Sequence, residues 1–389
     1  MENKSFLATL KKNAMLIVMV LVYLFFMVLT RGGIFKPSSF TELINQNAYV
    51  YILGTGMLMC MLTGGNIDLS CGAFVCLLGA FGGVFMIVRG MGVGVSILLL
   101  LAIGVIYGVF LGFLIAYIHI PPWIATLAGY LAFRGLGTSI LSNNSKTGSL
   151  APFPVKFQNI FYGRVFQTEK GIFNWPCFLF GILAAAAVVL VVFMTRKNRL
   201  AKGYEADTIR AAALKSGISS AAIILVMTKL SMDGGIPTTL LWVAGIVLIY
   251  SFITSKTTVG RHFYIVGGNM EAARLSGVNT RRIMFLAYLN MAILTAIATF
   301  TVVARSQSAY ADVGKNFEMD AISACVVGGV SASGGAGSVL GMVIGATLIG
   351  IINLGMSLIS LDANYQRVVK GVVLLAAVVF DILSKKKES

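Results

Sequence analysis

Hydrophobic residues in this chain gather in long runs that are separated by short polar stretches. Runs of about 17–25 apolar residues recur along nearly the whole length, and each is long enough to cross a bilayer as a helix. The pattern predicts an all-α, polytopic integral membrane protein, with about 10–12 transmembrane helices in a single transmembrane domain over residues 1–389. The expected spans are residues 14–30, 46–63, 69–88, 93–118, 123–141, 178–194, 214–231, 238–254, 283–304, 318–333, 338–359 and 367–383.

One polar stretch, residues 255–282, interrupts this pattern between two apolar runs and contains the start and stop signals of a short helix. Asn269 is a favourable N-cap, and Gly277 suits a left-handed C-terminal cap. Glu271 and Arg274 carry the charges that the two ends of a helix dipole prefer. A helix of about two turns is too short to be stable alone in water, so we expect it to dock on another protein.

The docking face of this short helix is expected to be small, because alanines lie at its centre. A helix of this kind on the water-facing loop of a membrane protein fits the groove of a partner. The residues assigned to docking are Asn269, Glu271, Ala272, Ala273, Arg274 and Gly277.

Composition and charge support the membrane interpretation. The chain is 58% hydrophobic and only 11% charged, whereas soluble proteins have about a quarter charged residues. The net charge of +16 comes from Lys and Arg scattered between the spans, which argues against nucleic acid as a partner. Because short basic loops stay cytoplasmic, we expect residues 255–282 and both termini to be cytoplasmic, and residues 142–177 to form an extracellular loop.

Glycines at helical spacing predict close helix–helix contacts, because small residues on one face let two backbones approach. Two such stripes occur, and whether they pack within one subunit or across a dimer stays open at this point. They are Gly104, Gly108 and Gly112 in one span, and Gly337, Gly341 and Gly345 in another.

Two further segments, residues 63–72 and 327–337, are apolar stretches broken by glycines, one in each half of the chain. Paired segments of this kind indicate a transport site at the interface of an internal pseudo-repeat, although the two share little beyond Gly-Gly and a following Ser. The residues assigned to a translocation path are Asn66, Asp68, Ser70, Ser331, Ser333 and Asn353.

Asp68 is the main candidate for a charge within the membrane, where an Asp at a helix centre costs about 2.5–3.5 kcal/mol. It either lines a polar path with Asn66 and Ser70, or caps the helix that starts near Leu69 by accepting free backbone N–H groups. Both interpretations stay open.

Residues for catalysis or metal binding are scarce. No Gly-x-x-x-x-Gly-Lys-Ser/Thr phosphate loop is present, so the chain does not hydrolyse ATP itself. Two histidines and five cysteines show no metal spacing, only Cys177 lies clearly in a loop, and the cysteines are expected to serve packing. We therefore expect neither an enzyme nor a metal site nor a cofactor in this chain.

Three sequence blocks resemble the permease subunits of bacterial ABC importers for monosaccharides, the ribose, xylose and galactose permeases, over nearly the whole chain. The extra stretch 196–231 is similar to the xylose and multiple-sugar branch. The blocks are Gly65-Asn-Ile-Asp-Leu-Ser-Cys-Gly72, Pro121-Pro-Trp-Ile-Ala-Thr-Leu127, and Thr258–Gly277 followed by Asp320-Ala-Ile-Ser-Ala-Cys-Val-Val-Gly-Gly329.

The resemblance implies an ATP-driven importer of the bacterial cytoplasmic membrane that works by alternating access. A permease dimer, expected to be a homodimer, would be driven by an ATPase with two fused nucleotide domains, which binds ATP and Mg. An extracellular or periplasmic sugar-binding protein would deliver the substrate. The family's coupling helix falls on Asn269–Gly277.

Other functions remain open. A permease of the same type could carry nucleosides, a signalling sugar or branched-chain amino acids. An ion-coupled secondary transporter is an alternative of a different class. The sequence does not identify the sugar.

Overall fold

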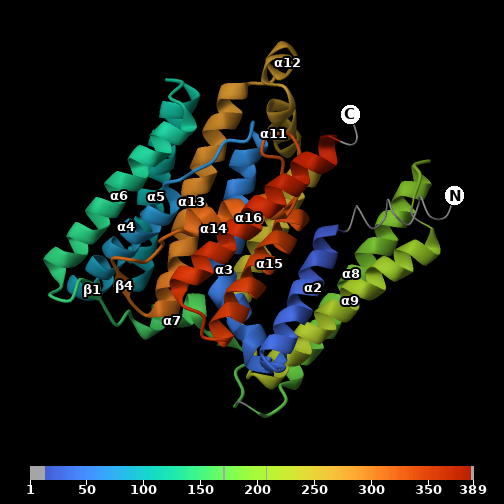
Figure 1. The fold of residues 1–389 in the computed structure, drawn as a ribbon, viewed down its shortest axis with the longest axis horizontal. Coiled ribbons are helices and arrows are strands. Elements are labelled where there is room, and N and C mark those ends of the chain that lie inside the picture. The colour runs from blue at the N-terminus through green and yellow to red at the C-terminus, as the bar shows by residue number, and fades with distance from the viewer. Residues whose placement is uncertain (1–13, 170, 207, 387–389) are drawn as a thin grey trace.

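The computed structural model describes residues 14–169, 171–206 and 208–386, and this part of the chain is almost entirely helical (Figure 1), as expected for the all-α class. Its α-helices are α2 (Ala14–Leu29), α3 (Pro37–Leu62), α4 (Cys71–Gly83), α5 (Val93–Ala116), α6 (Pro122–Asn144), α7 (Val155–Tyr162), α8 (Trp175–Ala201), α9 (Ile209–Met232), α10 (Thr238–Lys256), α11 (Thr258–Gly268), α12 (Met270–Leu275), α13 (Thr280–Ser306), α14 (Phe317–Val327), α15 (Val339–Leu358) and α16 (Ala363–Lys386). A 3-10 turn, Gly33–Phe35, precedes α3, and α4 continues as a π-helical segment, Val84–Val88.

Two pairs of very short antiparallel strands tie loops together. Strand β1 (Ser149–Leu150) pairs with β4 (Ala309–Tyr310), and β2 (Arg164–Val165) pairs with β3 (Ile236–Pro237). All four strands and α7 lie in the connections that join the spans at one end of the bundle. Helix α6 ends at Asn144 and α8 begins at Trp175, so the loop expected at 142–177 is shortened at both ends.

Eight helical stretches in the described part of the chain are long and apolar enough to cross a membrane, namely α4 with its π-helical continuation, α5, α6, α8, α9, α10, α13 and α15. Helices α2, α3 and α16 cover three more of the expected spans. The expectation for residues 318–333 is wrong, because α14 has 11 residues and ends at Val327. Gly328 and Gly329 follow, and Gly329 has a φ of +82°, which suits glycine. Helix α14 therefore reaches only part-way across a bilayer, which needs about 20 helical residues.

Helix α3 lies at the centre of the bundle and packs against α13, α14 and α15. It contains buried polar residues that a lipid-facing helix could not tolerate, and several of these have protein partners. Asn47 donates its side-chain N–H to the carbonyl of Ala346 at 2.7 Å, and the hydroxyls of Tyr51 and Thr347 lie 3.0 Å apart. The polar content of α3 is thus a consequence of its position inside the protein.

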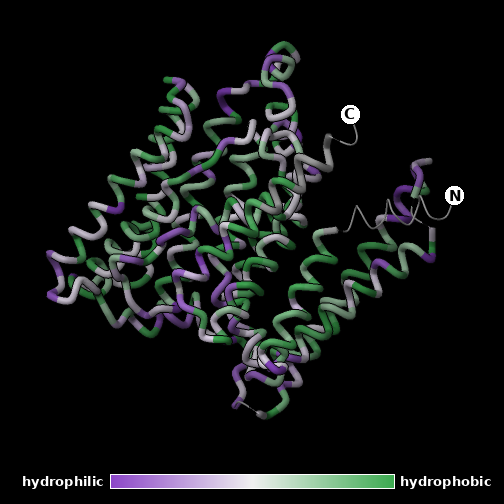
Figure 2. Tube along the Cα trace, in the orientation of Figure 1, coloured by the Kyte–Doolittle hydropathy of each residue, from purple (hydrophilic) through white to green (hydrophobic). Residues whose placement is uncertain are grey.

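The ends of the bundle differ in what they carry. In Figure 1, α12, the connection between α8 and α9, and the C-terminal end of α16 lie toward the top, while α7, β1 and β4 lie toward the bottom. Figure 2 shows hydrophobic residues along the shafts of the outer helices and hydrophilic residues gathered at their ends. This distribution is that of a protein whose helix shafts face lipid.

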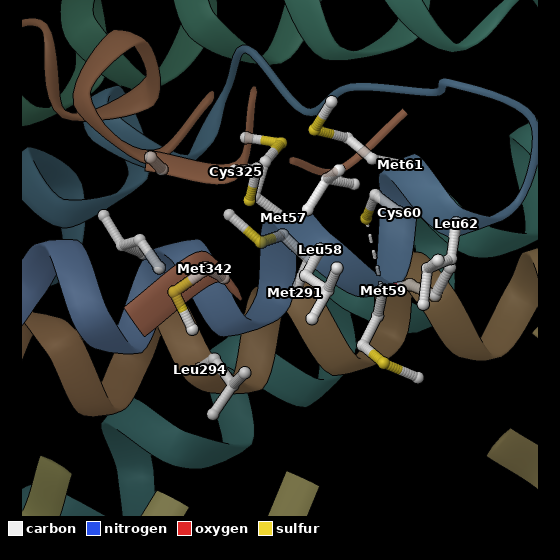
Figure 3. Packing of buried hydrophobic residues seen from close by; sticks show 14 of the residues in the cluster. Met57, Leu58, Met59, Cys60, Met61, Leu62, Met291, Leu294, Cys325 and Met342 are labelled. Carbon is white, nitrogen blue, oxygen red and sulfur yellow. Dashed lines mark hydrogen bonds between the residues drawn. The ribbon is translucent and has the colours of Figure 1, made fainter. Parts of the chain in front are cut away.

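Several sulfur-containing side chains lie in the core around α3 (Figure 3). Met57, Met291 and Met342 are fully buried there and come from three different helices. The thiol of Cys325 donates to the carbonyl of Gly54 at 3.2 Å. Met adapts its shape to irregular gaps more readily than branched side chains do, so this core can tolerate small shifts of the helices.

All five cysteines are buried and free, in agreement with a packing role. Cys177 was expected in a loop, but it lies in the first turn of α8. The helix begins earlier than its apolar run because Asn174 caps it, accepting the backbone N–H of Cys177 at 3.0 Å.

The first glycine stripe packs against α13 of the same chain. A Cβ on Gly108 would lie 2.9 Å from the Cα of Leu289, and a Cβ on Gly112 would lie 2.9 Å from the carbonyl oxygen of Phe285. Gly104 faces Ala296 with more room, since its Cβ would lie 3.2 Å from the alanine Cβ. The stripe thus brings two long helices into backbone contact within one subunit.

The second stripe packs on and just after α14. A Cβ on Gly341 would lie 2.3 Å from the carbonyl oxygen of Gly328, and a Cβ on Gly345 would lie 2.0 Å from that of Ala324. Gly337 precedes α15, has a φ of +150° and lies against Val330. This contact is also internal to the subunit.

We predict that Gly108→Ala lowers the stability of the purified protein by about 1–3 kcal/mol, because the new methyl group overlaps the α13 backbone. Thermal unfolding in detergent measures the effect. Gly94→Ala on the same helix is the matched control, since a Cβ there meets nothing within 4 Å. Equal melting temperatures for the two variants would contradict the close α5–α13 contact.

Candidate functional site

The polar stretch 255–282 folds into two helices, of which the sequence analysis expected only the second. Helix α11 begins after Thr257, whose hydroxyl accepts the backbone N–H of Gly260 at 3.1 Å. This Thr257 N-cap is a signal from which α11 could have been recognised. Helix α12 follows directly, so the short helix stands on a second helix that is anchored in the bundle.

The expected caps of α12 are present. The side chain of Asn269 accepts the backbone N–H of Ala272 at 2.9 Å, and Gly277 has a φ of +82°. Glu271 and Arg274 form an exposed ion pair at 3.1 Å. Local signals therefore define both ends of this helix.

The exposed face of α12 differs from the alanine face that the sequence suggested. Ala273 is fully buried against its own chain and cannot contact a partner, whereas Ala272 is exposed. The apolar side chains that α12 offers to solvent are Leu275, which is 80% exposed, and Met270, which is 45% exposed. These two side chains are the apolar contact area that α12 has available for a partner.

The two glycine-broken segments, which are far apart in sequence, meet in the structure. A Cβ on Gly65 would lie 1.9 Å from the carbonyl oxygen of Ala332, and a Cβ on Gly334 would lie 2.4 Å from the Cα of Gly64. Gly65 and Gly334 also have positive φ values of +74° and +86°. Only glycine combines this backbone conformation with so close an approach.

The C-terminal end of α11 inserts into the same contact. A Cβ on Gly267 would lie 1.7 Å from the carbonyl oxygen of Leu62 and 2.6 Å from the backbone N of Gly335. The N–H of Gly335 donates to that Leu62 carbonyl at 3.2 Å, and the hydroxyl of Tyr264 on α11 donates to the carbonyl of Gly337 at 3.1 Å.

We call the contact among Gly64, Gly65, Gly267, Gly334 and Gly335 the glycine junction. It joins the C-terminal end of α3, the segment after α14 and the helix that carries α12. Because backbone rather than flexible side chains meets there, a displacement of α11 must move both irregular segments or break the contact.

We predict that Gly267→Ala destabilises the protein by at least about 1–3 kcal/mol, because the methyl group has no space beside the Leu62 carbonyl. Thermal unfolding and gel filtration of the detergent-solubilised protein measure the effect. Gly268→Ala, one residue further along, is the control, since its Cβ would meet nothing within 4 Å. The junction would be disproved if both substitutions behaved alike.

Among the expected path residues, three lie around the glycine-broken segment 63–72. Asp68 is 1% exposed, and its Oδ1 accepts the backbone N–H and the hydroxyl of Ser70 at 2.7 and 2.6 Å. The Ser70 hydroxyl lies 2.7 Å from that of Tyr107 on α5. The side chain of Asn66 donates to the carbonyl of Thr63 at 2.9 Å.

These contacts favour a structural role for Asp68. The N-cap position of α4 is Ser70 itself, so Asp68 fixes the turn immediately before the helix rather than serving as its cap residue. In this conformation its carboxylate is enclosed by protein and does not line an open path.

We predict that Asp68→Asn keeps the fold, because an amide oxygen can accept the same two hydrogen bonds from Ser70. Asp68→Ala should lower the stability by about 1–3 kcal/mol, since it leaves the buried Ser70 N–H unpaired. Thermal unfolding of the two purified variants separates them. An equal loss of stability in the two variants would instead show that the negative charge of Asp68 stabilises the fold.

The other expected path residues divide between the two ends of α15. Ser331 and Ser333 lie in the segment after α14, with their hydroxyls 2.9 Å apart. Asn353 lies 14 residues into α15, about 20 Å along the helix axis from its start at the 1.5 Å rise per residue. We expected Asn353 to lie with the serines along one path, but the length of α15 places it near the opposite end of that helix.

A buried ion pair between α14 and α16 was missed in the sequence analysis. Lys370 lies 2.9 Å from Asp320, and the hydroxyl of Tyr49 on α3 donates to the same carboxylate at 2.6 Å. Asp320 is 4% exposed. An Asp and a Lys within two apolar stretches were the available signal, because intramembrane charges pair with each other.

Within the residues that the structure describes, no group of three or more His, Cys, Asp or Glu side chains is placed to hold a metal ion. The described arrangement consists of an exposed, capped helix, a backbone junction and two irregular segments that meet at this junction.

These features define a multi-pass membrane protein. The chain belongs to the family described as "Branched-chain amino acid transport system / permease component", whose profile matches residues 39–378. The resemblance seen in the three sequence blocks is thus confirmed at the level of the family.

Individual relatives agree with this assignment. The chain is 33% identical over 374 residues to the xylose transport system permease protein of Haemophilus influenzae, with 96% of each chain covered. It is 31% identical to the corresponding Escherichia coli protein, covering 96% of this chain and 92% of the relative. It is also 31% identical to the ribose import permease protein of Bacillus subtilis, covering 89% and 85%. No solved structure matches the chain.

All of these relatives are named as permeases of transport systems. The chain is accordingly a transporter subunit and not an enzyme. Its place in the family implies two kinds of partner, an ATPase and a substrate-binding protein.

Proposed function

We propose that this chain is the permease subunit of an ATP-driven importer that moves a monosaccharide into a bacterial cell. The observation that carries the proposal is α12, a two-turn helix with both ends capped and Leu275 exposed, which stands on the glycine junction. The similarity to xylose and ribose permeases supports a pentose or related hexose as the substrate.

The proposed ATPase partner receives α12 in a groove. Leu275 and Met270 supply the apolar contact, and the Glu271–Arg274 pair lies beside them at the rim. The ATPase is expected to have two fused nucleotide domains that bind ATP and Mg, and a second copy of the permease completes the complex.

The proposed mechanism is alternating access. Closure of the ATPase around ATP displaces α12, and the displacement passes through α11 to the glycine junction. There it moves the two irregular segments that follow α3 and α14. Nucleotide binding drives the change because the ATPase binds nucleotide more tightly in one of the two states.

The proposed location is the bacterial cytoplasmic membrane, with α12 and both chain ends on the cytoplasmic side. The basic residues in the α8–α9 connection and around α12 support this orientation. The opposite end of the bundle, with α7 and the strand pairs, then faces the sugar-binding protein.

A second candidate substrate is a branched-chain amino acid, which the name of the family favours. Nucleosides and signalling sugars also belong to this type of permease. Competition by unlabelled sugar, leucine and nucleoside against uptake separates these substrates.

We predict that proteoliposomes with this permease, its ATPase and its binding protein accumulate a pentose or hexose only when ATP is present. Leu275→Asp should reduce both ATPase copurification and uptake at least about 30-fold, as expected when an interface residue worth about 2 kcal/mol is lost. Radiolabelled uptake and pull-down in mild detergent measure the two effects.

The matched control is Leu200→Asp, which changes a half-exposed leucine near the C-terminal end of α8. It should leave both readouts unchanged. Normal coupling in Leu275→Asp would refute the docking role of α12, and uptake driven by an ion gradient without ATP would refute the importer itself.

A further inference from the structure

A polar cavity of about 340 Å³ opens at the end of the bundle opposite α12. It lies between the first turns of α3, the α7–β2 segment, the end of α9 and the last turn of α15. Cavities that bind small molecules start at about 300 Å³, so this one suits a ligand of monosaccharide size.

The charged side chains at this cavity compensate one another within the protein. Glu42 pairs with Arg305 of α13, and Arg164 pairs with Asp233 at 2.9 Å. Arg164 also donates to the backbone carbonyl of Asp233. A charged or zwitterionic ligand would need an uncompensated charge of opposite sign in the lining. Because the charges of the described lining are already paired, the cavity favours a neutral ligand.

The neutral groups of the lining are hydroxyls and an amide. Ser38, Thr41 and Asn45 lie at i, i+3 and i+7 on α3 and share one face of the helix. Tyr162 lines the cavity from the C-terminal end of α7 and carries a further hydroxyl. Each of these groups can donate and accept hydrogen bonds, which is what a polyol requires.

Two of these groups are buried without a partner. Thr41 is 4% exposed and Asn45 is 9% exposed, and within the described part of the chain neither Thr41 Oγ1 nor Asn45 Oδ1 has a hydrogen-bond partner. An unsatisfied buried polar group costs about 1–3 kcal/mol. A bound ligand that hydrogen-bonds to both atoms recovers this energy.

We propose that this cavity is a reception site for a neutral polyhydroxylated ligand, which enters the permease here before it reaches the glycine junction. Thr41 and Asn45 hydrogen-bond to ligand hydroxyls. Leu354 and Leu358 of α15 provide an apolar wall for the C–H face of the ring. The inference rests on the proposed function and deepens it by naming the site and the ligand chemistry.

The test uses a cysteine placed at the cavity. Ser38 is exposed and lines it, while all five native cysteines are buried, so Ser38→Cys should be the main site of maleimide labelling in the purified permease. D-xylose, D-ribose and D-galactose are the probes, and leucine is the comparison. A sugar should slow labelling at least threefold, and leucine should not.

Two variants identify the groups that bind. Thr41→Val and Asn45→Leu keep the side-chain shapes and remove the unpartnered atoms, and each should abolish the protection by sugar. Thr55→Val is the control on the same helix, because its hydroxyl bonds to the carbonyl of Tyr51 within α3. Protection should persist there.

The outcomes separate this site from the proposed function. ATP-driven sugar uptake without protection at Ser38→Cys would overturn the reception site and leave the importer standing. Protection by leucine alone would overturn both. Protection that survives in Thr41→Val and Asn45→Leu would show that the sugar binds elsewhere and would also overturn the assignment.

Discussion

The close contact of backbone with backbone at the glycine junction is the constraint on which the functional end of the molecule depends. Two irregular segments and the end of a third helix meet there without intervening side chains. Non-helical backbone at membrane depth persists only where other protein groups satisfy its polar atoms. The backbone N–H of Gly335 satisfies one such atom by donating to the carbonyl of Leu62. Gly267 of α11 packs against both groups, so this contact also fixes the position of α11 and of the α12 helix that follows it.

The junction contrasts with the core beside it. Around Met57, Met291 and Met342 the packing depends on long, unbranched side chains that change rotamer easily. The junction has no such freedom, because at Gly267 even one methyl group would overlap a carbonyl. The core can therefore adjust to a displacement of α11 by changes of side-chain rotamer, whereas the junction cannot. In the proposed mechanism, this arrangement directs movement toward the irregular segments instead of dispersing it through the bundle.

The features that sequence predicted well are those that local chemistry determines. The caps of α12 follow from Asn269 and Gly277 alone, and nearly all the long apolar runs became helices. What the sequence missed depends on tertiary position. Ala273 is buried because α12 lies on its own chain, and the Asp320–Lys370 pair requires two distant helices to be neighbours. The meeting of the two glycine-broken segments was expected from their pairing, but the insertion of α11 between them had no local signal.

Helix α3 connects the two ends of the protein at which function is proposed. Thr41 and Asn45 lie near its start, and the Leu62 carbonyl that anchors the junction lies at its last residue. Its 26 residues span about 39 Å without a break. If ligand binding at the cavity favours one position of α3, that position also favours one arrangement of the junction. By linkage, an ATPase that displaces α12 must then change the affinity of the cavity by the same factor. A single rigid helix would thus be sufficient to couple delivery of the sugar at one end to the ATPase at the other.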